Sequence, residues 1–234
     1  MRNPLACLTA TLSIACAHLS AASQCLPNRP AVTVQIRDYA HVKPKSLAKA
    51  TEIASRMYKR AGVGLEWLAV VSQDAAASPD ALRAEEAQHP VAELTINIVT
   101  SSIAKRSGYA GDVVGYVSVP PQGGMGRVGY VIYDRIKDVA AGGPASSSDI
   151  LGIIIAHDVG RLILGAGSGT FNGIMTRAWD QDALQRVNPM SLTFTPPEVE
   201  RLRAALNPDE CIASREATSD AKTPSPEPPS RSAR

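Results

Sequence analysis

Three polar side chains that could do chemistry interrupt one otherwise apolar segment, residues 150–164. They are His157, Asp158 and Arg161. Residues three or four apart share one face of a helix, so His157 and Arg161 point the same way and Asp158 lies one turn from Arg161. An imidazole can bind a metal ion, and a neighbouring carboxylate can activate a bound water. A guanidinium stays protonated and has no lone pair to offer, so Arg161 cannot be a metal ligand.

A glycine-rich turn follows this segment. Gly165 ends the predicted helix, because glycine adopts the conformation that a helix stop requires. The chain then turns through Gly167, Ser168 and Gly169 and continues with Gly173-Ile174-Met175. The helix pattern H-D-V-G-R and the tripeptide G-I-M together resemble the metzincin clan of zinc metallopeptidases. The similarity is to secreted bacterial members with a helix of the form H-E-L-G-H-L-L-L-G and a G-I-M Met-turn.

The resemblance implies a role for each matching position. The three zinc-ligand positions fall on His157, Arg161 and Gly169, the general base on Asp158, and the Met-turn on residues 173–175. Of the ligand positions, only His157 keeps a side chain that binds zinc. A catalytic zinc site needs about three protein ligands and an open position for water. The pattern therefore predicts a zinc-peptidase scaffold with a degenerate site, for which no cofactor is expected.

The three polar residues of the helix have a second interpretation, which we favour. Asp158 and Arg161 could form a partly buried ion pair, with the guanidinium in the space of the absent metal and close to a hydrogen-bonded His157. Charges buried without partners are very costly, so these groups are expected to satisfy one another. The other histidines outside the N-terminal segment, His41 and His89, are not placed by the sequence to complete a metal site.

The composition is that of one globular domain with distinct ends. The chain has 234 residues, of which 44% are hydrophobic and 20% charged, and its net charge of +2 gives no reason to propose a nucleic-acid partner. Residues 1–23 have the form of a secretory signal peptide, so a secreted or periplasmic location is expected, with no transmembrane segment after signal removal. Residues 214–234 are rich in Ser and Pro and are predicted to be disordered. The metzincin-like domain is therefore expected at residues 24–213.

Two of the four cysteines remain after signal removal. In an exported domain, Cys25 and Cys211 suggest one disulfide. The alternative is a pair of free thiols near the two ends of the domain.

Alternating and apolar runs predict the elements that position the helix. Strands are expected at residues 32–39, 65–71, 93–100, 113–119 and 128–133. Helices are expected at residues 46–61, 150–164 and 196–206. With the resemblance, this order implies an α+β fold: a metzincin-like twisted mixed β-sheet packed on a central active-site-type helix, with a Met-turn and a C-terminal helix.

Three functions remain open. The leading hypothesis is a secreted metallopeptidase-like pseudoenzyme that is catalytically inactive and binds a peptide or protein partner. The alternative is an active zinc-dependent metalloendopeptidase with non-standard ligands. The third is a structural domain whose motif similarity is fortuitous. Zinc content separates the first two hypotheses, and the topology of sheet and helix separates both from the third.

Overall fold

The computed structural model describes residues 30–72, 94–109, 113–170, 172–177 and 179–207. The predicted signal peptide, the predicted tail at 214–234, His89, Cys25 and Cys211 lie outside these residues. Among the helices in the described ranges, none is long and apolar enough to cross a membrane.

The described strands form one mixed sheet in the order β2-β1-β4-β6-β5, with β3 also paired to β1. The pairs are parallel except β5 with β6, which is antiparallel. This confirms the predicted mixed sheet, and most of it is parallel. The predicted strand at 65–71 is two short strands separated by residues 68–70. The bounds are β1 Ala31–Asp38, β2 Gly64–Trp67, β3 Val71–Ser72, β4 Leu94–Val99, β5 Gly115–Ser118 and β6 Val128–Ile132.

The three predicted helices are confirmed as α1 (Pro44–Arg60), α5 (Ser147–Leu164) and α7 (Pro196–Leu206). Three helices were not predicted: α3 (Ser101–Arg106), α4 (Tyr133–Ala141) and α6 (Gln181–Arg186). Their side-chain contacts explain two of them. The Thr100 hydroxyl accepts a hydrogen bond from the Ile103 amide and caps α3, and the Asp134 carboxylate at the start of α4 accepts one from the Ser101 amide at 2.8 Å.

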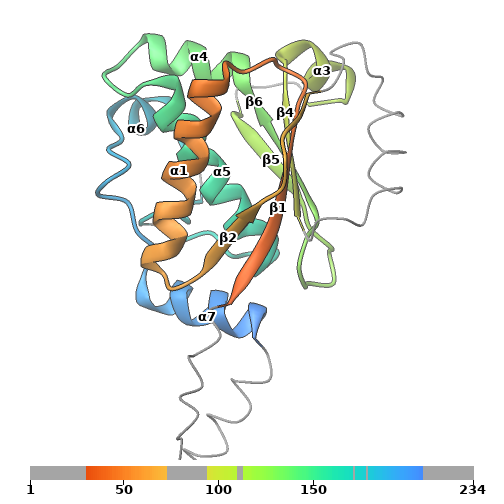
Figure 1. Ribbon diagram of the computed structural model, residues 1–234, viewed down its shortest axis with the longest axis vertical. Coiled ribbons are helices and arrows are strands. Elements are labelled where there is room, and N and C mark those ends of the chain that lie inside the picture. Colours follow the sequence, from red (N-terminus) through yellow and green to blue (C-terminus); the bar gives the residue numbers. More distant parts are fainter. Residues whose placement is uncertain (1–29, 73–93, 110–112, 171, 178, 208–234) are drawn as a thin grey trace, which may run out of the picture.

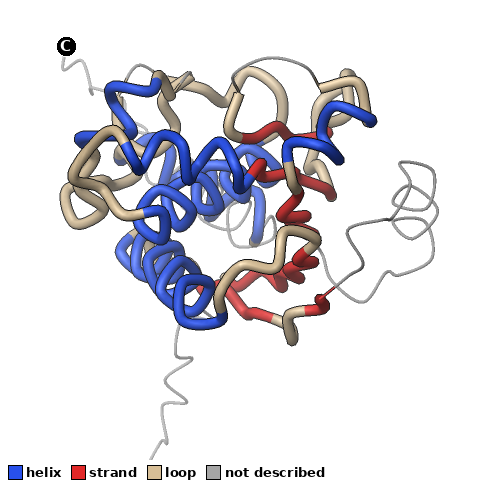
Figure 2. The backbone as a smooth tube through the Cα atoms, turned by 90° about the horizontal axis from the view of Figure 1, so that it is seen from above, coloured by secondary structure: helices blue, strands red, loops and turns tan. Residues whose placement is uncertain are grey.

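The helices α1 and α5 lie side by side on one face of the sheet (Figure 1), and the view from above shows most of the helical segments on one side of the strands (Figure 2). Nearly all of α5 is buried, which is typical of a helix that is apolar on every side. Gly152 brings α1 close, because a Cβ there would lie 2.7 Å from the Ala50 carbonyl oxygen. The fold thus places α5 beside α1, with α5 packed against β4, β5 and β6.

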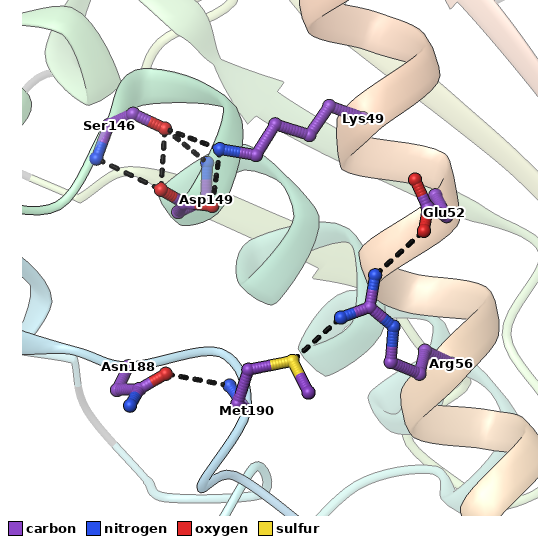
Figure 3. A network of polar contacts seen from close by, with 7 residues as sticks. All are labelled: Lys49, Glu52, Arg56, Ser146, Asp149, Asn188 and Met190. Carbon is purple, nitrogen blue, oxygen red and sulfur yellow. Dashed lines mark hydrogen bonds and ion pairs between the residues drawn. The ribbon is translucent and has the colours of Figure 1, made fainter.

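Polar contacts fix the start of α5 against α1 (Figure 3). Ser146 and Asp149 form a capping box, in which the side chain of each bonds the backbone amide of the other. Lys49 of α1 lies 2.9 Å from Asp149. The same face of α1 carries Arg56, which contacts Glu52 and Met190. The first turn of α5 is thereby held in register with α1.

Candidate functional site

A pocket of about 350 Å³ lies between the C-terminal half of α5 and the edge strand β5. His157, Asp158 and Arg161 all line it, so the structure brings together the three polar residues that the sequence singled out. Gly115 of β5 and two residues beyond the glycine-rich turn, Arg177 and Trp179, also contribute to its wall.

His157 is neutral and has a defined tautomer. Its Nδ1 atom lies 2.9 Å from the Ile174 carbonyl oxygen, and because a carbonyl can only accept, Nδ1 carries the proton. The Nε2 atom therefore keeps a lone pair. The pKa of His157 is lowered to about 4, chiefly by burial and to a smaller degree by the charge of Arg161, and the hydrogen bond to Ile174 opposes both effects. At neutral pH the imidazole is an acceptor at Nε2.

The segment predicted as the Met-turn packs directly against α5. Ile174 and Met175 are fully buried. A Cβ at Gly160 would lie 2.6 Å from the Met175 sulfur, so only glycine at this point of the helix permits the close approach. Gly173 has a φ of 75°, a left-handed conformation that glycine adopts without strain. These contacts connect the turn to the same helix face that carries His157.

Glu198 of α7 connects the last helix to the turn that contains Ile174 and Met175. The residue is 1% exposed, and its carboxylate accepts hydrogen bonds from the Thr195 amide at 2.7 Å and from the Thr170 hydroxyl at 2.9 Å. The first bond belongs to the capping box of α7, and the second reaches the loop that leads into Ile174. One buried carboxylate therefore joins the last helix to the turn that orients His157.

Asp158 is a buried acid without a hydrogen-bond partner at Oδ2. This atom packs against β5, since a Cβ at Gly115 would lie 2.8 Å from it. Burial raises the pKa of Asp158 to about 8, against the lowering effect of the Arg161 charge. The carboxyl is thus mostly protonated at pH 7, and a protonated carboxyl cannot accept a proton from water.

The predicted ion pair between Asp158 and Arg161 is wrong. Within the described ranges no hydrogen bond or ion pair joins the two side chains, and Arg161 Nε, like Asp158 Oδ2, has no hydrogen-bond partner. Residues three apart on a helix pair only when their rotamers converge, and here the Asp158 carboxyl packs toward β5 instead. Arg161 acts on Asp158 through its charge alone.

Gly169 contributes no ligand, and its surroundings exclude a simple replacement. A Cβ at this position would lie 2.7 Å from Cγ of Arg177, whose Nε donates to the Gly169 carbonyl oxygen at 3.2 Å. In this turn Gly165 and Gly167 have a positive φ, whereas Gly169 does not. The crowding by Arg177, not the backbone conformation, makes glycine necessary.

The donor set of the pocket does not fit a catalytic zinc ion. His157 Nε2 is a suitable ligand, Arg161 cannot be one, and Gly169 has no side chain. Across the part of the chain that the structure describes, no three His, Cys, Asp or Glu side chains are grouped so that they could hold a metal. His41 is exposed in the loop between β1 and α1 and does not line the pocket.

Arg177 and Trp179 are pocket residues that sequence reasoning did not assign. They follow Met175 by two and four positions. No local sequence pattern places them in the pocket, because their position depends on a tight turn of the folded chain. The Thr170 amide donates to the Met175 carbonyl at 2.7 Å and the Arg177 amide donates to the Thr170 carbonyl at 2.9 Å. These bonds close residues 170–177 into a loop that returns the chain to α5.

Comparison with known proteins identifies the fold. No protein-family model matches the sequence, and no curated protein sequence matches it. Among solved structures, the crystal structure of archaemetzincin from Methanopyrus kandleri is similar, with a TM-score of 0.52 and 12% identity over 78% of this chain and 99% of that one. A zinc-dependent peptidase from Methanocorpusculum labreanum has a TM-score of 0.45 and 12% identity over 72% of this chain and 99% of its own. At 12% identity the similarity supports the fold alone. That fold is metallopeptidase-like, with a mostly parallel mixed sheet packed on helices.

Proposed function

We propose that this protein is a non-catalytic peptide-binding domain built on the metallopeptidase-like fold. The observation that carries the proposal is the pocket over α5, which has an edge strand as one wall and is lined by Arg161, at a position that the resemblance matches to a zinc ligand. The predicted export and the predicted disulfide between Cys25 and Cys211 belong to the same proposal.

The edge strand β5 can accept an extended peptide. The Ile132 amide donates to the Val114 carbonyl at 2.8 Å, which sets the hydrogen-bonding phase of the antiparallel ladder between β5 and β6. Because hydrogen-bonded and non-bonded positions alternate in such a ladder, the backbone groups of Gly115 and Val117 point away from β6. No described strand pairs with that edge. An added peptide strand would supply the missing partners and place its side chains along the pocket.

The chemistry of the pocket supports binding without catalysis. Two of the three positions matched to zinc ligands have no ligating side chain. Asp158, at the position matched to the general base, is mostly protonated at neutral pH because burial raises its pKa to about 8. Neither a metal-bound water nor a ready base is thus supplied by the described residues.

One observation favours the alternative of an active zinc endopeptidase. The Nδ1–H of His157 donates to Ile174, which leaves Nε2 as the type of nitrogen that binds zinc. A single ligand is too few, so this alternative needs two further donors from outside the described residues.

The peptide-binding proposal is tested by fluorescence anisotropy of the purified full chain with a labelled mixture of short extended peptides. Val117→Pro removes the outward amide hydrogen of β5 and is tolerated at an edge position, whereas Val117→Ala shortens the side chain and keeps the amide. We expect Val117→Pro to weaken binding about tenfold and Val117→Ala to weaken it much less. Equal affinities of the two variants, or no binding by the unmodified chain, would reject the proposal.

A further inference from the structure

Two buried hydrogen-bond donors in the pocket have no acceptor. Arg161 Nε and Trp179 Nε1 are both shielded from solvent without a hydrogen-bond partner, and both residues line the same pocket. A buried donor left unpaired costs stability, and native structures satisfy nearly all such groups. Two of them in one pocket indicate that the natural ligand brings acceptor atoms.

The charge of the pocket favours an anionic acceptor. Among its described lining residues, Arg161 and Arg177 carry positive charge, Asp158 is the one acid, and His157 is neutral. The pocket keeps a net positive charge even when Asp158 is ionised. A cation would meet two guanidinium groups and a single acid, and the described donor set does not fit a metal.

We propose that this pocket binds a carboxylate of the bound peptide, with Arg161 Nε–H and Trp179 Nε1–H as its hydrogen-bond donors. A carboxylate is acceptor-only and has two oxygens, so one group can receive bonds from two donors, and a guanidinium is its preferred partner. The inference rests on the peptide-binding function proposed above. The carboxylate has two possible sources, the C-terminus of the peptide or an acidic side chain within it.

The two tryptophans of the chain give this proposal an internal control. Trp67 Nε1 already donates to the Ser55 hydroxyl at 2.7 Å, whereas Trp179 Nε1 has no acceptor. In a proton–nitrogen correlation spectrum of the full chain, each indole gives a separate resonance, which Trp179→Phe assigns. A carboxylate bound as proposed shifts the Trp179 indole proton downfield and leaves the Trp67 indole unchanged.

Sodium acetate, titrated at constant ionic strength against sodium chloride, is the first probe. We expect a saturable shift of the Trp179 indole that Arg161→Met abolishes. Arg161→Lys should restore only part of it, because lysine keeps the charge without the Nε donor. Arg186→Met is the matched control, since Arg186 is an exposed arginine of α6 outside the pocket, and it should leave the shift intact. The proposal is overturned if acetate does not change the chemical shift of the Trp179 indole proton, or if the change is equally large in Arg161→Met.

Three labelled peptides of one neutral extended sequence then identify the source. One has a free C-terminus, the second a C-terminal amide, and the third the amide with a central glutamate. We expect one carboxylate-bearing peptide to bind about tenfold more tightly than the neutral amide, and Arg161→Met to remove that advantage. A tighter free C-terminus indicates recognition of the peptide end, and a tighter glutamate peptide indicates an internal acid. Equal affinity of all three peptides refutes the carboxylate site and leaves the peptide-binding function standing.

A different result would reject the peptide-binding function. If no peptide binds while acetate still shifts Trp179 in an Arg161-dependent manner, the carboxylate site is supported and the peptide-binding function is rejected. Circular dichroism and thermal unfolding of each variant confirm that lost shifts do not come from lost folding.

Discussion

His157 donates its Nδ1 proton to the carbonyl oxygen of Ile174 at 2.9 Å, so the turn that follows α5 orients this imidazole. The bond spans 17 positions of sequence and is buried. It fixes both the ring orientation and the tautomer, and it leaves Nε2 as a hydrogen-bond acceptor. The imidazole is thus held in one orientation, although no three His, Cys, Asp or Glu side chains of the described residues are grouped to hold a metal.

The low pKa of His157 predicts a pH dependence of stability. The pKa is about 4 in the folded chain against an ordinary 6.5, so the unfolded state binds the proton more tightly. The stabilising contribution is complete above pH 6.5 and is lost as the pH falls toward 4, with a slope of at most about 1.4 kcal/mol per pH unit. Urea unfolding of the unmodified chain and of His157→Gln checks this. The difference in unfolding free energy between them should grow from pH 4 to 6.5 and then level off, and a constant difference would contradict the low pKa.

Asp158 and Arg161 should be only weakly coupled. An intimate buried ion pair loses about 3 to 5 kcal/mol when one partner is removed. Since no hydrogen bond or ion pair joins these two side chains, we expect a double-mutant cycle of Asp158→Asn and Arg161→Met to give a coupling energy below about 1 kcal/mol. Chemical denaturation of the two single variants, the double variant and the parent supplies the four values. Coupling of 3 kcal/mol or more, on the scale of an intimate pair, would restore the ion-pair hypothesis.

Glu198 should matter more for stability than an ordinary surface glutamate. Its buried carboxylate loses two hydrogen bonds in Glu198→Ala, one of them in a capping box, for an expected cost of about 2 to 3 kcal/mol. Thr170→Val should cost about 1 kcal/mol, and the double variant less than the sum. Glu52→Ala is the matched control, because its exposed pair with Arg56 in Figure 3 contributes less than about 0.5 kcal/mol. Similar costs for Glu198→Ala and Glu52→Ala in thermal unfolding would disprove the anchoring role.

Sequence reasoning found the elements with long, regular patterns. The apolar run of α5, the alternation of β4 and the Thr195-Pro196 start of α7 were all predicted within a few residues. The short helices α3 and α4 were not, because their stability comes from contacts made in the folded chain. The Asp134 carboxylate bonds the Ser101 amide 33 positions away, and no local periodicity encodes such a contact.

The sequence predicted that His157, Asp158 and Arg161 share one helix, but not how their side chains lie. The structure adds that all three line one pocket. Whether Asp158 would meet Arg161 or β5 depends on a rotamer and on the absence of a side chain at Gly115, which spacing cannot show. Trp179 lines the pocket only because the turn after Thr170 brings the chain back to α5, and spacing cannot show this either.

Rebuilding a zinc site should require more than the missing ligands. Asp158→Glu, Arg161→His and Gly169→His would supply the base and two ligands that the resemblance implies. A side chain at Gly169 collides with Arg177, however, so we expect this triple variant to bind zinc weakly and the further change Arg177→Ala to tighten binding about tenfold or more. Competition with a colorimetric zinc chelator at neutral pH measures both. Equal affinity with and without Arg177→Ala would show that Arg177 is not the obstacle.

The most direct test of the central claim is the zinc stoichiometry of the purified full chain, measured by elemental mass spectrometry after equilibration with zinc and gel filtration. Because Arg161 and Gly169 stand at two of the three positions that the resemblance matches to zinc ligands, we predict no stoichiometric zinc and no cleavage of casein or gelatin. One tightly bound zinc per chain, whose removal by a chelator abolishes proteolysis, would contradict the account and establish the active peptidase instead.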